Sequence, residues 1–396
     1  MCDSFGKAHQ IIEILSVKSV AQIQAEANGD MTFVGLKSAS KSHTEVLARL
    51  DERLARSSVR EGWIERQHFT DATAALWLEG ELVHLEDLVL HDAHMDIRTP
   101  THELTRAHAV LRTRRRILAQ KPDWALGRDG FLALTGRSGA VSAGQKNREG
   151  EGTQAGAVEV YGRDDAEDDL LAEEFAEIDA VLARSSKILA GADVPARKEE
   201  TSRCDRPDLI YDLDWNEEER LAEWQAGLAD TREWPLVMRA AILLEAWQDI
   251  EVLQHAAWLG SLLVAALLRQ EGLAAHHLAG LHLGAKNIPR ERRRARNRSD
   301  RLLAYLDAIH EAAVAGLKEH DRLVLAKSQM ERRLKQRRAS SKLPDLLELV
   351  LSRPVVSTGM IQEVLKVSKQ GALNLVGELG LREMTGRGRF RAWGIM

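Results

Sequence analysis

The stretch at residues 343–396, LPDLLELVLSRPVVSTGMIQEVLKVSKQGALNLVGELGLREMTGRGRFRAWGIM, has the clearest local structure signals in the chain. Its first leucines recur at helical spacing and predict a helix that ends at Arg353, because Pro354 restricts the preceding residue and cannot continue the helical ladder. Ser357 is a suitable N-cap for a second helix. That helix would bury three apolar side chains, those of Ile361, Val364 and Leu365.

A third helix is predicted to begin after Ser368, which is again a good N-cap. Its buried positions would be Ala372, Leu373, Val376 and Leu379. Gly380 stands where a helix C-cap needs a left-handed residue, and Leu381 follows as an apolar contact. Two short extended runs then flank residues 385–388, which is typical of a β-hairpin. Helix, turn, helix and hairpin in this order indicate a winged helix-turn-helix.

Polar and cationic side chains occupy the positions of this unit that would face double-stranded DNA. A recognition helix presents its N-terminal, solvent-facing residues to the major groove, where Gln and Asn can pair with adenine and Lys can reach guanine or phosphate. Arginines on the wing would lie beside the DNA backbone or the minor groove. The predicted contacts are Ser368, Lys369, Gln370 and Asn374 on the helix and Arg387, Arg389 and Arg391 on the wing.

Winged helices also serve as dimerisation or protein-interaction modules, and this alternative stays open. Gly371 and Gly377 lie inside the predicted recognition helix, where each costs about 1 kcal/mol of helix propensity relative to Ala.

Length and composition predict a multidomain, mostly α-helical protein. The chain has 396 residues and a net charge of -5, with acidic residues concentrated in 164–219 and basic residues in 290–342. Apolar residues recur at intervals of three and four, while aromatic and strand-forming residues are sparse. The expected units are an N-terminal helical region at 1–135, a flexible linker at 136–165, a second helical domain at 166–342 and the winged helix-turn-helix at 343–396.

The cysteines, the N-terminal pattern and the length of the apolar runs indicate a cytoplasmic protein. Cys2 and Cys204 are far apart and have no metal-site spacing, which excludes a disulfide framework and a structural zinc site. The N-terminus lacks an export signal pattern, and the longest apolar run, at 256–268, is too short to cross a bilayer. We expect no membrane association, no metal and no cofactor.

Two clusters of titratable residues are candidates for other sites. His84, Asp87, His91 and His94 would share one face of an amphipathic run at 72–94, but they do not form an HExxH motif, and a solvated face is the favoured interpretation. His276, His277 and His282 follow a helix end, where the helix dipole favours a His cation.

Basic residues suggest two further surfaces. A helix at 103–119 is predicted to have a basic face formed by Arg112, Arg114, Arg115 and Arg116. The run at 290–298, with later residues, could contact DNA phosphates or form a solvated face, and both interpretations stay open. The later residues are Arg332, Arg333, Lys335, Arg337 and Arg338.

The central segment WPLVMRAAILLEAWQDIEVLQHAAWLGSLLVAALLRQEGL, at 234–273, resembles the Fic family. The resemblance implies a helix, a catalytic loop and a second apolar helix, with a loop motif HPFxDGNGR that supplies a His base, an acidic metal ligand and a phosphate-binding glycine nest. Two registers place the loop on IEVLQHAAW. The functional positions would hold Ile250, Gln254, Ala256 and Trp258 in one register and Glu251, His255, Ala257 and Leu259 in the other.

Neither register keeps a working motif, so the resemblance implies the fold and not the activity. A weaker similarity lies in TAALWLEGELVHLEDLVL, which resembles the inhibitory helix of the same family. Glu79 and Gly80 match that helix, but Ala75 occupies the position of its hydroxyl residue. Fic proteins often end in a winged helix, and the architecture is also similar to that of plasmid-borne bacterial helix-turn-helix proteins.

The sequence thus predicts a DNA-binding transcriptional regulator with a catalytically inactive Fic-like scaffold. A homodimer would allow it to bind a palindromic site. The alternatives are a nucleotidyl-transfer enzyme of the AMPylation type with a relocated site, and a protein-interaction scaffold.

Overall fold

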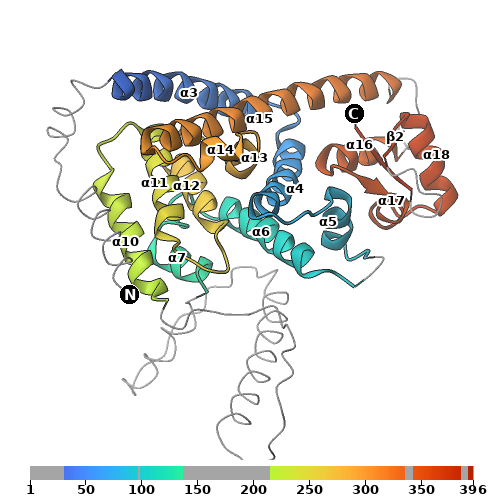
Figure 1. The fold of residues 1–396 in the computed structure, drawn as a ribbon. Helices are drawn as coiled ribbons and strands as arrows, with labels where there is room; N and C mark the ends of the chain where they lie inside the picture. The colour runs from blue at the N-terminus through green and yellow to red at the C-terminus, as the bar shows by residue number, and fades with distance from the viewer. Residues whose placement is uncertain (1–30, 97–98, 137–214, 335–341, 385–390, 396) are drawn as a thin grey trace, which may run out of the picture. The chain divides into compact units, whose positions relative to one another are not determined.

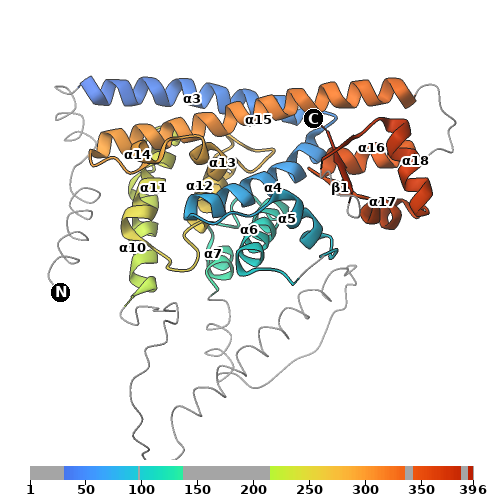
Figure 2. The same ribbon diagram turned by 45° about the vertical axis from the view of Figure 1, so that its right-hand side comes forward.

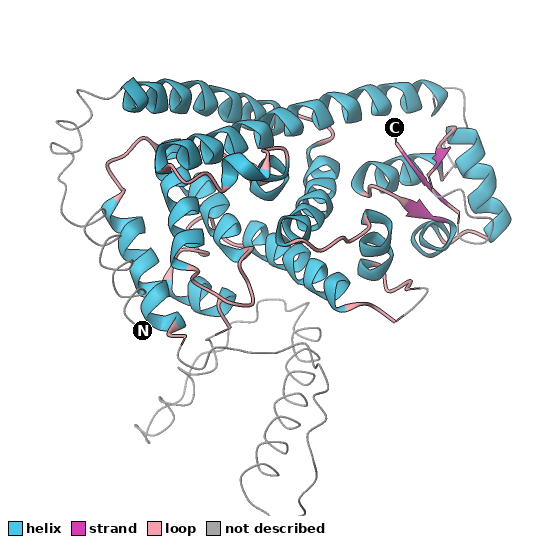
Figure 3. Ribbon diagram, viewed as in Figure 1, coloured by secondary structure: helices cyan, strands magenta, loops and turns pink. Residues whose placement is uncertain are grey.

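A computed structural model describes residues 31–96, 99–136, 215–334, 342–384 and 391–395, and these residues are predominantly helical (Figures 1 and 3). The N-terminal helices are α3 (Met31–Ala55), α4 (Arg60–Glu79), α5 (Leu85–Asp92), α6 (His102–Ala119) and α7 (Arg128–Leu134). The central helices are α10 (Glu217–Asp230), α11 (Leu236–Ile250), α12 (Leu259–Gln270), α13 (Leu281–Lys286), α14 (Arg290–Arg293) and α15 (Arg298–Leu334). The C-terminal elements are α16 (Leu343–Ser352), β1 (Val356–Ser357), α17 (Thr358–Leu365), α18 (Lys369–Leu379), β2 (Arg382–Glu383) and β3 (Ala392–Gly394).

The helices on either side of the predicted linker pack together. Buried residues of α4 and α6 belong to the same hydrophobic cluster as those of α11, α12 and α15. Helix α4 contacts α13 and α15, so helices of the predicted regions 1–135 and 166–342 share one core in the described part of the chain. The predicted mostly α-helical class is confirmed. Apart from Gly136, the predicted linker at 136–165 lies outside the described residues.

Helix α15 is the longest element, with 37 residues, and many other helices pack against it (Figure 2). It runs parallel to α3, because successive contacts advance along both helices. His43 lies 3.9 Å from Asp307, and ten residues later Arg53 donates a 2.8 Å hydrogen bond to Asp321. Near its C-terminal end α15 contacts α16 and α18, so one helix joins the helical body to the C-terminal unit.

The amphipathic run predicted at 72–94 is two helices rather than one. Helix α4 ends at Glu79 because Gly80 adopts a left-handed conformation, with φ of +93°, and its amide donates to carbonyls of the last turn. Helix α5 begins after His84, which is its N-cap, and His94 lies beyond its end with a positive φ. The four candidate metal ligands therefore do not share one continuous helical face.

The prediction of a basic face on α6 is wrong for Arg114. Arg114 is fully buried, whereas Arg112 is exposed. Arg115 forms ion pairs with Glu65 and Asp92, with shortest distances of 2.9 and 2.5 Å. The periodic pattern identified these residues as polar but gave no sign of carboxylates supplied by other helices.

A buried polar network joins the N-terminal and central helices around Asp71. Arg114 donates a 2.5 Å ion-paired hydrogen bond to the carboxylate of Asp71, and both side chains are fully buried. The Nδ1 atom of His282 lies 2.8 Å from the same carboxylate, and the backbone amide of Leu283 donates to it at 2.9 Å. Arg114 also donates to the carbonyl of Leu278 at 3.0 Å. Buried charges require such pairing, so these contacts fix the register of α4, α6 and the segment before α13.

The acidic groups in the core predict a loss of stability at low pH. Burial alone would raise the pKa of Asp71, but Arg114 and His282 outweigh it and lower the pKa from 3.8 to about 2. Asp51 likewise has its pKa lowered to about 2, because hydrogen bonds from His277 and His276 outweigh burial.

A carboxylate whose pKa is lower in the folded state stabilises the fold above the unfolded pKa, and this stabilisation is lost as the pH falls through the folded pKa. We therefore expect a free energy of unfolding that is steady above about pH 5 and falls between about pH 4 and pH 2, by roughly 2 kcal/mol for Asp71 alone. Urea denaturation at stepped pH would measure this. A free energy of unfolding independent of pH across that window would contradict it.

Candidate nucleic-acid interface

The C-terminal unit has the order of elements predicted from the sequence. Helix α16 ends at Ser352, and the hydroxyl of Ser357 accepts a 3.2 Å hydrogen bond from the amide of Met360 at the start of α17. Lys366 adopts a left-handed conformation in the turn to α18, with φ of +54°. Strand β3 pairs antiparallel with both β1 and β2, which gives the sheet order β1-β3-β2. These elements form a winged helix-turn-helix.

The apolar positions of this unit were mostly predicted correctly. Ile361 and Leu365 are buried in α17, and Ala372, Val376 and Leu379 are buried in α18. Leu373 is only partly buried. The prediction for Val364 is wrong, because its side chain is 59% exposed. Buried apolar side chains of α17 and α18 thus belong to one core, while other residues of α18 are exposed to solvent.

The N-terminal half of α18 presents the predicted contact residues. The hydroxyl of Ser368 accepts a 3.1 Å hydrogen bond from the amide of Gly371 and so caps the helix. Lys369, Gln370 and Asn374 are exposed. The side-chain amide of Gln370 donates a 3.0 Å hydrogen bond to the carbonyl oxygen of Asn374, one turn later. Two amide groups capable of pairing with a base edge are therefore held side by side on one helical face.

Of the three wing arginines predicted to contact DNA, the structure describes Arg391. Arg391 is exposed and donates to the carboxylate of Glu383 at 2.6 and 2.9 Å, and its guanidinium lies 5.6 Å from the centre of the Trp393 ring. The carboxylate of Glu383, which accepts these hydrogen bonds, raises the pKa of Arg391. This ion pair crosses from β2 to the start of β3 and fixes the base of the wing. Arg387 and Arg389 lie outside the described residues, so their predicted DNA contacts stay predictions.

The end of α15 anchors the C-terminus of the recognition helix. The guanidinium of Arg333 donates to the carbonyl of Leu379, the last residue of α18. A cation at this position is favoured by the helix dipole. Gly380 follows with φ of +69°, and a Cβ atom there would lie 1.8 Å from a guanidinium nitrogen of Arg333. Glycine is thus favoured at this C-cap for its backbone conformation, and a larger residue would displace the guanidinium of Arg333.

Two arginines that the sequence analysis did not single out attach the winged helix to the helical body. Arg66 of α4 donates to the carbonyls of Val350 and Arg353, at 3.1 and 2.5 Å, and to Glu319 at 2.9 Å. Arg322 bridges Glu319 and the carbonyl of Ile395, the latter at 2.6 Å. Together these contacts hold the end of α16 and the strand that leads out of the wing.

A second set of contacts secures the same junction from α5. Arg353 donates a 2.8 Å hydrogen bond to Asp92, which also binds Arg115 at 2.5 Å. The guanidinium groups of Arg353 and Arg115 each lie 5.2 Å from the ring centre of Phe69. Because the partners are separated by up to 261 residues in sequence, no local pattern could have identified them.

The two glycines of α18 predict gains of different size on substitution by alanine. A Cβ atom at Gly377 would have no neighbour within 4 Å, whereas one at Gly371 would lie 3.3 Å from the capping hydroxyl of Ser368. Gly377→Ala is therefore expected to raise the free energy of unfolding by about 0.5–1 kcal/mol, the usual difference in helix propensity. Gly371→Ala is the matched control and should gain less. Thermal or urea denaturation measures both, and an equal gain at the two positions would contradict the packing described.

Several of the remaining candidate residues form contacts within the body. Arg292 pairs with Asp307 at 2.6 Å, and Arg298 pairs with Glu245 at 2.9 Å. His91 lies 2.9 Å from Asp96. In the described segments, no group of three or more His, Cys, Asp or Glu side chains is placed to hold a metal ion. Lys335, Arg337 and Arg338 lie outside them.

Comparison with known proteins agrees with the geometry of the C-terminal unit. Residues 343–396 match the family model described as HTH DNA binding domain. The chain thus has a helix-turn-helix DNA-binding domain, with α18 as its exposed second helix. Residues 209–335 match a different model, described as Protein of unknown function (DUF1612). Among the described residues, no helix is long and apolar enough to span a bilayer.

A full-length relative extends the similarity to most of the chain. The chain is 52% identical, over 355 residues, to the protein named Uncharacterized protein y4cF of Sinorhizobium fredii (strain NBRC 101917 / NGR234). The matched region spans 88% of this chain and 93% of the relative. The chain belongs to the same family as this Sinorhizobium protein.

These comparisons do not support the Fic-like interpretation of the central segment. The structure does place a loop between two apolar helices there, since α11 ends at Ile250 and α12 begins at Leu259. In that loop Val252 and Leu253 are buried in the core, while the exposed His255 lies 3.6 Å from Glu217. A helix, a loop and a helix are too common an arrangement to identify a family.

Proposed function

We propose that this protein is a transcriptional regulator that binds a specific sequence in double-stranded DNA. The observation that supports this best is the Gln370–Asn374 amide pair on the exposed face of α18, directly after a helix N-terminus capped by Ser368. Paired amides recognise adenine in the major groove, and Lys369 supplies a charge for phosphate or guanine. The helix-turn-helix family match supports the same role.

We further propose that the protein binds DNA as a homodimer and that the helical body is a scaffold without catalytic activity. One recognition helix contacts only a few base pairs, so two copies related by a two-fold axis would recognise a palindrome. The loop between α11 and α12 favours a body without catalytic activity, because Val252, Leu253 and Ala256 pack into the core rather than lining an open site.

Selection of bound sequences from random duplex DNA by the full chain tests the proposal. We expect enrichment of two inverted half-sites, with centres about 10 base pairs or one further helical turn apart. Affinity for the enriched sequence should fall steeply with salt, because each phosphate contact releases counterions. No enrichment at low salt, together with tight binding to another protein, would instead favour an interaction scaffold.

Incubation with labelled ATP and candidate protein substrates tests the scaffold role separately. We expect no covalent label on the protein or on the substrates. Labelling that survives denaturation would contradict the proposal and favour a nucleotidyl-transfer enzyme.

A further inference from the structure

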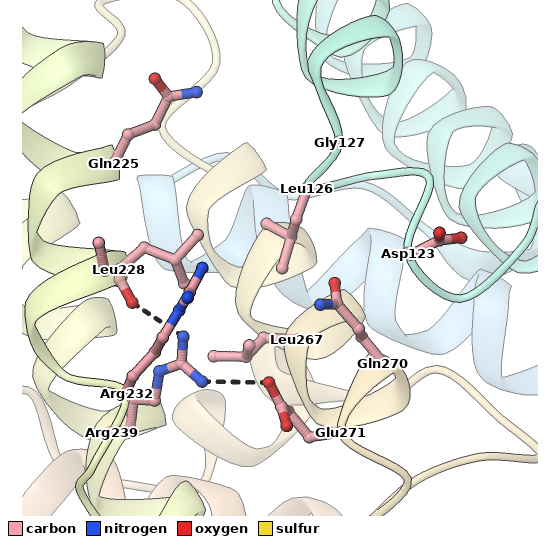
Figure 4. A pocket seen from close by; sticks show the side chains of 11 residues that line it. Asp123, Leu126, Gly127, Gln225, Leu228, Arg232, Arg239, Leu267, Gln270 and Glu271 are labelled. Atoms are coloured by element: carbon pink, nitrogen blue, oxygen red, sulfur yellow. Dashed lines mark hydrogen bonds and ion pairs between the residues drawn. The ribbon is translucent and has the colours of Figure 1, made fainter.

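A pocket of about 600 Å³ lies in the helical body and opens between α10, α11, α12 and the segment before α7 (Figure 4). This volume is within the range of sites that bind small molecules. The wall includes apolar side chains from three elements and polar side chains from α10 and α12. They are Leu126, Gln225, Leu228, Leu267 and Gln270.

Two arginines, Arg232 and Arg239, line this pocket (Figure 4). Arg239 is buried, with 5% of its surface exposed. Its Nη2 donates to the carbonyl of Leu228 at 2.8 Å and its Nη1 to Glu271 at 3.2 Å. Its Nε has no hydrogen-bond partner among the described residues. A buried donor without a partner is costly, so Arg239 holds its charge in the wall of the pocket with one donor unsatisfied.

Arg232 supplies a second cation that the protein itself does not neutralise. In the described part of the chain, its guanidinium forms neither a hydrogen bond nor an ion pair, and the residue is exposed at the pocket opening. The carboxylate of Asp123 points away from both arginines in Figure 4. Two guanidinium groups and the carboxylate of Glu271 leave one net positive charge, which matches a monoanion better than a dianion.

From this arrangement we infer that the pocket binds a small carboxylic acid with an apolar body. Its carboxylate pairs with the exposed guanidinium of Arg232, and the charge of the buried Arg239 adds to the attraction. Its apolar part packs against Leu126, Leu228 and Leu267, and the amides of Gln225 and Gln270 add hydrogen bonds at the rim. This inference does not rest on DNA binding.

Isothermal titration calorimetry of the full chain tests the inference. The probes are benzoate and hexanoate, and each is compared with its uncharged amide. We expect saturable binding of at least one acid and binding of its amide that is at least about tenfold weaker, because the charge-assisted hydrogen bonds are lost. Arg232→Gln should weaken binding of the acid by a similar factor. Arg112→Gln is the matched control, since Arg112 is an exposed arginine outside the pocket, and it should leave binding unchanged.

Several results would overturn the inference. These are equal binding of an acid and its amide, unchanged binding in Arg232→Gln, an equal loss in Arg112→Gln, or no saturable binding of either acid. If inorganic phosphate alone bound saturably, the pocket would be a site for a different class of anion and not for a carboxylate. Arg232 is exposed and its side chain forms no hydrogen bond or ion pair among the described residues, so its variant should fold normally, which a thermal denaturation curve would verify.

Discussion

Asp71→Asn is expected to lower the free energy of unfolding by about 3–5 kcal/mol, the usual cost of leaving a buried charge without its partner. The substitution keeps the size and shape of the side chain but removes the negative charge that Arg114 faces at 2.5 Å. Arg114 is fully buried and would then keep only neutral partners, such as the carbonyl of Leu278. The guanidinium cannot lose its proton to compensate.

Urea denaturation followed by circular dichroism measures this effect against a matched control. Asp321→Asn also removes a carboxylate that pairs with an arginine at 2.8 Å, but both partners are exposed, so a change of about 0–1 kcal/mol is expected. The double variant Asp71→Asn with Arg114→Met should recover part of the loss, because no unpaired charge remains. Equal effects of Asp71→Asn and Asp321→Asn would contradict the buried network.

Replacing both amides of the recognition helix, as Gln370→Ala with Asn374→Ala, is expected to reduce discrimination between the selected sequence and unrelated DNA by about 100-fold or more. Each bidentate contact to a base contributes about 1–3 kcal/mol of discrimination, and both contacts are removed. Both side chains are exposed, so the fold should be unchanged. No charge is lost, so binding to unrelated DNA and its dependence on salt should also be nearly unchanged.

Competition binding at one fixed salt concentration measures the discrimination directly. Gln120→Ala provides a control for an exposed glutamine outside the DNA-binding domain, and it should have no effect. A double variant that keeps full discrimination would show that another surface recognises the bases. A double variant that loses affinity equally for all sequences would show that these amides position the protein rather than select the site.

The C-terminal unit was predictable from the sequence because its boundaries follow local rules. Ser357 and Ser368 cap the helices that follow them, and Gly380 takes the left-handed conformation expected at a C-cap. Each of these signals involves residues no more than four positions apart. The error at Val364 arose because helical periodicity assigns it to the apolar face, although nothing covers that side of α17 among the described residues.

The body was less predictable because long-range pairs determine its polar contacts. The spacing of the arginines on α6 gave no sign that Arg114 meets Asp71, which lies 43 residues away. The sequence likewise gave no sign of the pocket, whose two arginines converge only when α10 and α11 pack beside α12. The attachment of the winged helix through Arg66 depends on carbonyls more than 280 residues further along the chain.

The length of α15 has a mechanical consequence for the recognition helix. At about 1.5 Å per residue, its 37 residues form a rod about 55 Å long. Arg333, in the last turn of that rod, is bonded to the end of α18. A rotation of about five degrees around the opposite end of such a rod would displace Arg333 by about 5 Å, close to one helical turn. Small adjustments where α3, α11 and α13 contact the rod would therefore be magnified at the surface that faces DNA.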